Sequence, residues 1–376
     1  MTRRAGVVVL DDYFPRLSTG FRVAEFSWML RHGVVSEVLT TAGPIDLLLD
    51  EYDLAHPGQR ARIRSYDVAR LAGFELASVV FLNNVHHYLD DLEHAELPFV
   101  LTLYPGGGLQ LGDAGVEAKL QRVLASPLIR HVVTTQPIVT DHVRESAPGL
   151  PLTEIVGVPV GREHLFPGAG LRPSYFLEGK DSLDVCFVAQ RYTADGRDKG
   201  FPTFLETVQQ LSDDGLPVRG HVVGGFDMEQ VPDGLGRLDL TFHGVLSTGS
   251  LRQFFSSQDV IVSLPVPGVL APGAFDGFPT ASCVEAALNG VAIVSSDPLD
   301  QNRVFQDGRD IHVTGGSALE AAGRVRAMLA EPGGLRRVGQ AGMRTARRAY
   351  GVGAQLIPRR TILESLTSRP DGSLRR

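Results

Sequence analysis

Cysteine is nearly absent from this sequence of 376 residues, which contains only Cys186 and Cys283. Both lie inside apolar segments, and neither has a partner at the spacing of metal ligands. The sequence therefore argues against a disulfide framework and against a zinc site. We expect both thiols to be buried and inert.

Long apolar runs are also missing near the amino terminus. The opening stretch MTRRAGVVVLDDYFP has an apolar run of only five residues, Gly6 to Leu10. That run is too short for the core of a signal peptide or for a membrane span. We therefore expect a cytoplasmic protein.

Positive charge is not in excess either. The formal net charge is −7 and the pI is about 5.9, and the basic residues are scattered rather than gathered in the stripe typical of nucleic-acid-binding proteins. We expect no nucleic-acid partner. With 43% hydrophobic and 21% charged residues, the chain is neither disordered nor fibrous. Its length suits two domains of roughly 150 to 180 residues each.

Apolar strands alternate with helical periodicity along the first half of the chain, which predicts a parallel α/β sheet covered on both faces. The expected strands of this half are 6–10, 36–41, 78–84, 99–104, 131–136 and 153–159. The same alternation then starts again, with expected strands at 183–190, 220–225, 238–244, 259–265 and 291–297. The region 317–350 looks helical.

These patterns predict four parts. An amino-terminal domain spans 1–165, a linker spans 166–180, a carboxyl-terminal domain spans 181–345, and a helix and tail follow at 346–376. Open parallel sheets bind ligands at the carboxyl ends of their strands.

The stretch DGFPTASCVEAALNGVAIVSSD, residues 276–297, joins a Gly/Pro-rich loop, a helix and a strand. The helix amino terminus at Thr280 offers free N–H groups to an anion such as a phosphate. Asp276 and Glu285 bracket this start and can accept hydrogen bonds from sugar or ribose hydroxyls. The alternative is structural: Asp276 belongs to a turn, and Glu285 forms a capping box with Ser282.

A charged loop follows the strand at 183–190 and carries Arg191, Arg197 and Lys199. Cations at the carboxyl end of a strand suit a diphosphate, whose charge needs two or more of them. Taken alone, the loop is better interpreted as a solvated basic turn, which is common at protein surfaces.

Together these motifs resemble the retaining, metal-independent family-4 glycosyltransferases. The resemblance rests on Asp276-Gly277-Phe278-Pro279, Glu285-Ala286, Gly290-Val291 and the stretch CFVAQRYTADGRDKG, and it extends over nearly the whole chain. It implies the GT-B fold, an α/β architecture of two Rossmann-like domains facing each other across a cleft. In that fold the last helix can return to the first domain.

The resemblance also implies roles for individual residues. Arg191 and Lys199 would hold the donor diphosphate, Asp276 would touch the donor sugar, and Glu285 would bind the ribose. Backbone groups near His243 to Val245 would recognise the base. The further donor-binding candidates are Gly20, Arg197, Gly224, Gly277, Phe278, Pro279 and Thr280.

Two spacings depart from the family pattern. The step from Asp276 to Glu285 is nine residues, one more than usual, so Phe275 or Gly277 competes for the place of Asp276. The gap between Arg191 and Lys199 is also longer than usual, which makes Arg197 a competitor for the phosphate. On the acceptor side the candidates are His86, His87 and Tyr104, the last standing where many members have histidine.

The implied activity is a hexosyltransferase-type transfer from a nucleotide diphosphate sugar to an acceptor hydroxyl, with retention. The acceptor would be a small molecule, a glycan or a lipid-linked group. No Asp-x-Asp motif is present, so no metal and no further cofactor are expected. The alternatives are a nucleotide-sugar epimerase or hydrolase on the same fold and a catalytically silent nucleotide-sugar-binding protein. The basic stretch RRVGQAGMRTARRAY leaves peripheral membrane contact open.

Overall fold

The computed structural model describes residues 5–165, 174–235 and 237–367. The chain forms two compact units, the first made of Met1–Pro159 with Val352–Arg376 and the second of Val160–Gly351. The division at 159/160 lies upstream of the expected linker. Of that linker, 166–173 falls outside the described residues, and the small parallel sheet of β8 (Tyr175–Phe176) and β9 (Gly179–Lys180) follows it.

Unit 1 is built on a seven-stranded parallel sheet with the order β3-β2-β1-β4-β5-β6-β7. Its central apolar strands, such as β4 and β5, are buried on both faces, as a sheet covered by helices requires. The strands are β1 (Ala5–Asp11), β2 (Glu37–Thr40), β3 (Ile63–Ser65), β4 (Phe74–Val80), β5 (Phe99–Leu103), β6 (Ile129–Thr134) and β7 (Leu152–Glu154). The short edge strand β3 was not predicted, because three residues carry too little alternation to be recognised.

One predicted strand of unit 1 is wrong at its end. The stretch 78–84 was expected to be extended throughout, but β4 ends at Val80. Phe81 adopts a positive φ of 71°, which turns the chain directly into α3. The helices are α1 (Gly20–Arg31), α2 (Ile45–Ala55), α3 (Leu82–His94), α4 (Ala114–Leu124), α5 (Pro137–Ser146) and α12 (Val352–Ser365), with 3-10 turns η1 (Arg60–Arg62) and η2 (Val68–Gly73).

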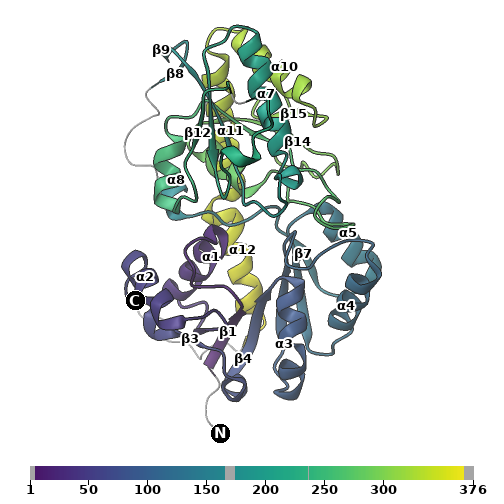
Figure 1. The fold of residues 1–376 in the computed structure, drawn as a ribbon. Helices are drawn as coiled ribbons and strands as arrows, with labels where there is room; N and C mark the ends of the chain where they lie inside the picture. The colour runs from purple at the N-terminus through teal and green to yellow at the C-terminus, as the bar shows by residue number, and fades with distance from the viewer. Residues whose placement is uncertain (1–4, 166–173, 236, 368–376) are drawn as a thin grey trace. The chain divides into compact units, whose positions relative to one another are not determined.

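The carboxyl-terminal helix α12 packs against α1 (Figure 1), and a buried polar cluster fastens it to unit 1. Arg359 lies 3.5 Å from Glu25, and these side chains are only 2% and 3% exposed. Both residues also bond the Tyr104 hydroxyl, which donates to Glu25 at 2.9 Å and accepts from Arg359 at 3.1 Å. Gln355 donates to the carbonyl of Val156 at 2.8 Å. The last helix is therefore an integral part of unit 1.

Unit 2 contains a six-stranded parallel sheet with the order β12-β11-β10-β13-β14-β15. These strands correspond to the repeated apolar runs of the second half of the chain, with β15 added at the edge. They are β10 (Leu183–Val188), β11 (Val218–Val223), β12 (Leu240–Phe242), β13 (Val260–Ser263), β14 (Ala292–Ser296) and β15 (His312–Thr314).

Helices cover both faces of the unit 2 sheet. α7 and α10 pack together on one face, whereas α8, α9 and α11 cover the other. Each face encloses an apolar core, one around Phe187 and Phe204 and the other around Phe255 and Ile293. The helices are α6 (Arg162–Leu165), α7 (Phe201–Asp213), α8 (Thr248–Phe255), α9 (Ala281–Leu288), α10 (Ala318–Leu329) and α11 (Gly334–Tyr350), with turns η3 (Arg197–Lys199) and η4 (Met228–Gln230).

Both cysteines are buried, as expected. Burial raises the pKa of Cys283 to about 11, so its thiol stays protonated at neutral pH. Within the described residues, no helix combines the length and the apolar character needed to cross a bilayer.

Candidate functional site

The strand order of unit 2 reverses between β10 and β13. From β10 the chain proceeds to β11 and β12 on one side, and then returns to β13 on the other. At such a reversal the loops leaving the two strands diverge and open a crevice at the carboxyl edge of the sheet, where α/β proteins bind ligands. The loop after β10 carries Lys199, and the loop after β13 carries Asp276.

Lys199 and Asp276 meet at this reversal, although 77 positions separate them in sequence. The ammonium group of Lys199 donates to both carboxylate oxygens of Asp276, at 2.7 and 2.8 Å. The Lys199 side chain is 14% exposed and that of Asp276 27%. Nζ of Lys199 also lies 4.9 Å from the ring centre of Tyr192. The pair is half-buried, and its aromatic neighbour comes from the same loop.

Backbone contacts hold the two loops together. The N–H of Val266 donates to the carbonyl of Asp198 at 3.0 Å. Gly200 has φ +78°, and a Cβ there would stand 2.1 Å from the Leu264 carbonyl oxygen, so only glycine fits this close approach. This packing brings Asp276 to Lys199 despite the unusual spacing. Phe275, a competitor for that place, is instead buried at 9% exposure.

The two arginines of the loop differ in their partners. Arg197 is 66% exposed and bonds Asp195 at 2.6 Å, so both solvent and its partner screen its charge. Arg191 donates to the Ala194 carbonyl at 3.2 Å, and the described residues place no carboxylate within ion-pair distance of it. Arg191 therefore retains more of its charge for an anionic ligand than Arg197 does.

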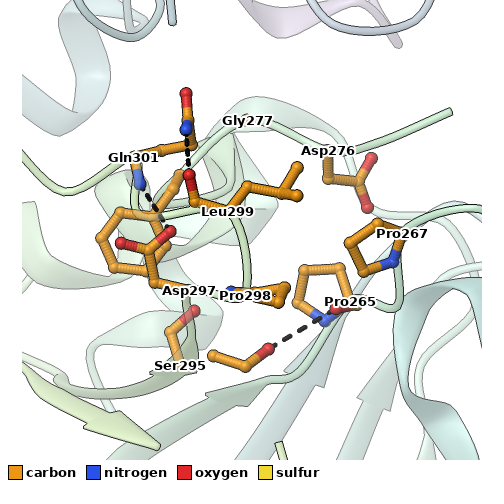
Figure 2. A pocket seen from close by; sticks show the side chains of 11 residues that line it. Pro265, Pro267, Asp276, Gly277, Ser295, Asp297, Pro298, Leu299 and Gln301 are labelled. Carbon is orange, nitrogen blue, oxygen red and sulfur yellow. Dashed lines mark hydrogen bonds between the residues drawn. The ribbon is translucent and has the colours of Figure 1, made fainter. Parts of the chain in front are cut away.

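A pocket opens beside Asp276 at the carboxyl ends of β13 and β14. Figure 2 shows Asp276 and Pro267 on one side of it, and Asp297 and Gln301 on the other. The full lining is Pro265, Pro267, Asp276, Gly277, Phe278, Ser295, Ser296, Asp297, Pro298, Leu299 and Gln301.

Sequence reasoning missed the half of the pocket contributed by the loop after β14. The carboxylate of Asp297 there accepts from the N–H groups of Gln301 and Asn302, at 2.8 and 2.9 Å. These bonds shape the loop. A carboxylate at the end of a predicted strand was the signal that could have identified it.

Helix α9 begins where the sequence predicted, with Thr280 at the N-cap and Ala281 as its first residue. No side chain caps it. Ser282 is thus the second residue of the helix rather than its cap, and the alternative of a Ser282–Glu285 capping box is wrong. The first N–H groups of α9 remain available to an anion, and the helix dipole favours one there.

Glu285 lies on α9 in a largely buried setting, with a side chain 13% exposed. Burial, and then the charge of Glu163, raise its pKa to about 7. The nearest ring nitrogen, Nε2 of His164, stands 3.9 Å away, too far for a hydrogen bond. Burial, and then Arg252, lower the pKa of His164 to about 4, so its ring is neutral. The Glu285 carboxyl makes no hydrogen bond to any described residue, although buried polar groups normally have partners.

The pKa of Glu285 makes the stability of unit 2 depend on pH. Because the folded pKa of about 7 lies above the ordinary value of 4.5, folding favours the protonated form, and this benefit disappears as the pH rises through 7. Each tenfold change in the acid constant is worth about 1.4 kcal/mol, so the full effect is up to about 3 kcal/mol. Glu285→Gln, which cannot ionise, should gain stability relative to wild type between pH 5 and 8.5. Urea unfolding of both proteins at pH 5 and at pH 8.5 tests this prediction. If the free energies of unfolding of variant and wild type differ by the same amount at both pH values, the prediction is wrong.

The predicted donor-side glycines have different surroundings. A Cβ on Gly224, whose φ is +132°, would stand 2.0 Å from the Ala189 carbonyl oxygen, so this glycine serves close backbone packing. A Cβ on the adjacent Gly225 would have no atom within 4 Å, so Gly225, which was not predicted, has the open space that a ligand needs. Gly20 is the first residue of α1 in unit 1.

The predicted acceptor-side residues are not brought together. His86 and His87 lie on the exposed surface of α3. Tyr104 is 2% exposed, and its hydroxyl bonds Glu25 and Arg359 as described above. An acceptor-contacting role for Tyr104 is therefore not supported, because burial and both hydrogen bonds occupy its phenol.

The corresponding reversal in unit 1, between β1 and β4, carries a polar group that sequence reasoning missed. Arg22 bonds the buried Asp11 at 2.8 Å and Asp12 at 2.6 Å, and Asn84 donates to Asp12 at 3.0 Å. The DDY stretch after the first strand was the available signal. Across 5–165, 174–235 and 237–367, no three His, Cys, Asp or Glu side chains are placed to hold a metal ion.

A family model and many solved structures match this chain. Residues 199–355 match the family model described as glycosyl transferase-like, a match to less than half of the chain that includes Lys199, Asp276 and Glu285. No curated protein matches the sequence significantly.

Solved structures match over nearly the whole chain at low identity. Anabaena HepE in complex with UDP has 14% identity and a TM-score of 0.71, covering 96% of this chain and 100% of that chain. A glycosyltransferase from Rickettsia africae has 11% identity and a TM-score of 0.70, covering 97% and 99%. Sucrose-phosphate synthase from Thermosynechococcus elongatus has 14% identity and a TM-score of 0.66, covering 96% and 99%. The chain has the predicted GT-B fold of two Rossmann-like units.

Proposed function

We propose that this protein is a retaining glycosyltransferase that moves a hexose from a nucleotide diphosphate sugar to an acceptor hydroxyl. The observation that carries the proposal is the Lys199–Asp276 pair at the strand-order reversal of unit 2, beside the uncapped amino terminus of α9. A cation and free N–H groups suit a diphosphate, and a carboxylate next to them suits a sugar hydroxyl. The glycosyl transferase-like match to residues 199–355 supports the same reading.

The donor that the comparisons favour is a uridine diphosphate sugar. Anabaena HepE, of the same fold, has been solved with UDP and with UDP-glucose. In this chain Arg191 and Lys199 would bind the diphosphate, and Asp276 would accept from the sugar. The unpartnered carboxyl of Glu285 would bond the ribose hydroxyls. Gly277 to Thr280 would contribute backbone groups.

The proposed transfer needs a stabilised leaving group. As the bond between the anomeric carbon and the phosphate oxygen breaks, negative charge grows on the nucleotide diphosphate. Lys199, Arg191 and the α9 N–H groups are fixed before the reaction, so they stabilise that charge without reorganising. The acceptor oxygen attacks the same face of the sugar, and its proton passes to the departing phosphate oxygen. The product then keeps the anomeric configuration, which NMR of the product would report.

Titration calorimetry with UDP tests the proposed site. Wild type should bind UDP, and Lys199→Met should weaken binding by about 10- to 100-fold, the cost of one charge-assisted contact. Lys119→Met is the control, because Lys119 bonds Asn83 on unit 1 and should leave binding unchanged. If no nucleoside diphosphate binds, or if Lys199→Met binds as wild type does, the proposal is wrong. Conversion of UDP-glucose without any acceptor would favour an epimerase or hydrolase instead.

A further inference from the structure

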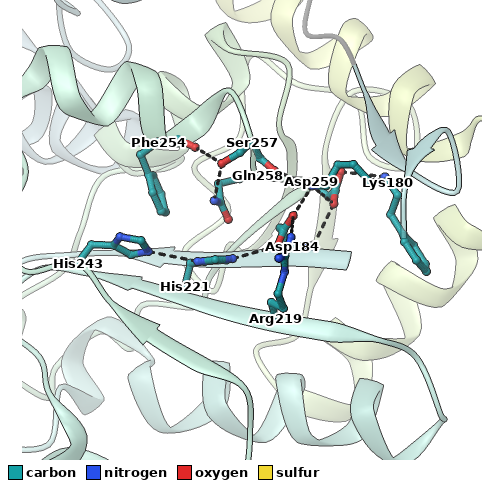
Figure 3. A network of polar contacts seen from close by, with 10 residues as sticks. Lys180, Asp184, Arg219, His221, His243, Phe254, Ser257, Gln258 and Asp259 are labelled. Carbon is teal, nitrogen blue, oxygen red and sulfur yellow. Dashed lines mark hydrogen bonds and ion pairs between the residues drawn. The ribbon is translucent and has the colours of Figure 1, made fainter. Parts of the chain in front are cut away.

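Three hydrogen-bonded side chains form a row across one face of the unit 2 sheet (Figure 3). Asp184 of β10 bonds Nε2 of His221 of β11 at 3.0 Å. Nδ1 of His221 in turn lies 3.2 Å from Nε2 of His243, which directly follows β12. Phe254 of α8 lies against both rings, with ring centres 6.2 and 5.0 Å away. The proposed transfer mechanism does not use this row.

Asp184 is fixed as a carboxylate at the inner end of the row. It is 2% exposed, and burial alone would oppose its ionisation. Hydrogen bonds from His221, Arg219 and Lys180 outweigh that effect and hold its pKa well below the usual range. Arg219 contributes two of these bonds, at 2.7 and 3.0 Å. Asp184 can therefore only accept hydrogen bonds, and its neighbour must donate.

That requirement propagates along the row. Because Asp184 accepts, Nε2 of His221 carries a hydrogen, and in the neutral ring Nδ1 is then a lone pair. This lone pair can accept only if Nε2 of His243 carries a hydrogen. In a neutral His243 the remaining nitrogen, Nδ1, is consequently a bare acceptor. The row thus selects one of the two tautomers of His243.

His243 stands at the carboxyl edge of the sheet, on the same side as Lys199. The carbonyl of the following Gly244 accepts from the N–H of Gly224 at 2.9 Å, which ties the loops after β11 and β12 together. β12 lies two strands from β10, a separation of roughly 10 Å at the usual strand spacing. That separation is comparable to the distance from the diphosphate of a nucleotide to its base.

We propose that Asp184 and His221 fix His243 as a hydrogen-bond acceptor at Nδ1, and that this acceptor selects a pyrimidine base with a ring N3–H, uracil or thymine. The inference rests on the proposed function, since it concerns the base of the same donor. Cytosine has a lone pair at N3, which faces the Nδ1 lone pair unfavourably. Adenine likewise offers only lone pairs on its ring nitrogens.

Proton uptake by the histidine pair reverses this selection. If the pair gains one proton and the hydrogen bond between His221 and His243 is kept, Nδ1 of His243 must carry a hydrogen, whichever of the two rings becomes charged. Burial, and then the charge of His221, lower the pKa of His243, so the acceptor form prevails at neutral pH and above. Asp184 on β10 is the charged group in direct contact with the pair. Asp184 in turn pairs with Lys180 on β9 and Arg219 on β11, and Asp259 before β13 and Asp239 before β12 act on Arg219. On α8, whose Phe254 packs against both rings, the basic residue of the last turn is Arg252.

The test combines NMR with binding. At pH 8, ¹⁵N spectra of the imidazoles of the whole chain should show His243 with hydrogen on Nε2 and none on Nδ1. Calorimetry at the same pH should give UDP at least a tenfold preference over CDP and over N3-methyl-UDP. His221→Phe, which keeps an aromatic ring but removes the acceptor, should reduce the preference to below about threefold. His131→Phe, the same change on β6 of unit 1, should preserve it.

The outcomes separate this inference from the proposed function. If UDP binds and depends on Lys199, but His221→Phe keeps the full preference, only the role of His243 is overturned. Hydrogen on Nδ1 of His243 at pH 8 overturns it as well, and this spectrum needs only wild type. If wild type binds no nucleoside diphosphate, the proposed function is wrong and the base selection falls with it. The inference is supported if wild type loses its preference for UDP over CDP between pH 8 and pH 5.5 and His221→Phe shows no such change with pH.

Discussion

Lys199→Met should lower kcat/KM for sugar transfer by about 10²- to 10³-fold, the usual cost of removing one preorganised donor to a developing negative charge. Lys199 is held in place by two hydrogen bonds to Asp276 and is only 14% exposed. Its charge therefore acts in a partly desolvated site, where it counts for more than in water. The measurement is steady-state transfer from UDP-glucose, or from whichever donor calorimetry identifies.

Variants of its partners show whether the pair acts as a unit. Asp276→Asn should also reduce transfer, and the double variant should be little worse than Lys199→Met alone, because residues that act together are not additive. Arg191→Met should cost more than Arg197→Met, since Arg197 is 66% exposed and its charge is screened by solvent and by Asp195. Lys119→Met should retain full activity. Strictly multiplicative losses in the double variant would show that Lys199 and Asp276 act separately.

The second large effect concerns stability. Arg359→Met should destabilise unit 1 by about 3–5 kcal/mol, because it leaves the Glu25 carboxylate buried without its counter-charge. Arg360→Met is a matched control on the next residue. Arg360 pairs with Glu364 at the surface, where the two side chains are 41% and 52% exposed, and such pairs contribute no more than about 1 kcal/mol. Chemical unfolding of both variants at pH 8 gives the comparison.

The loss in Arg359→Met should also depend on pH. Burial raises the pKa of Glu25 even in the presence of Arg359, and removing the arginine raises it further. Because the folded pKa lies above the ordinary value of 4.5, stability is retained at low pH and lost as the pH rises. Arg359→Met should therefore be closer to wild type at pH 5 than at pH 8. A deficit that is equal at both values would mean that lost packing, not an unpaired charge, causes it.

The parallel sheets were predictable because their strands are short apolar runs between helical stretches. The start of α9 was equally accessible, since a Gly/Pro-rich loop ending at Thr280 marks it. The end of β4 was not, because the apolar run continues through Phe81 and only the positive φ at that residue ends the strand. Local patterns thus identified elements more reliably than their ends.

The side-chain partners were harder to predict. Nothing local to Tyr104 or Glu25 indicates that Arg359, some 255 positions from Tyr104, completes their cluster. Three residues joined by tertiary packing alone leave no periodic signal. The Lys199–Asp276 pair was within reach only because each residue follows a strand at the same sheet edge. The loop after β14 lines the same pocket as Asp276. It was overlooked because its Asp297 was treated as the end of a motif.

The discontinuity of unit 1 affects how the protein is made. Residues 1–159 emerge from the ribosome long before residues 352–367. The first part of unit 1 therefore cannot acquire its last helix until the whole of unit 2 has been translated. Until then Glu25 and Tyr104 have no Arg359, and the α1 face that α12 covers stays open. Unit 1 can therefore be completed only after α12 has been synthesised. A prematurely terminated chain would display an incomplete unit 1 to the cell's quality control.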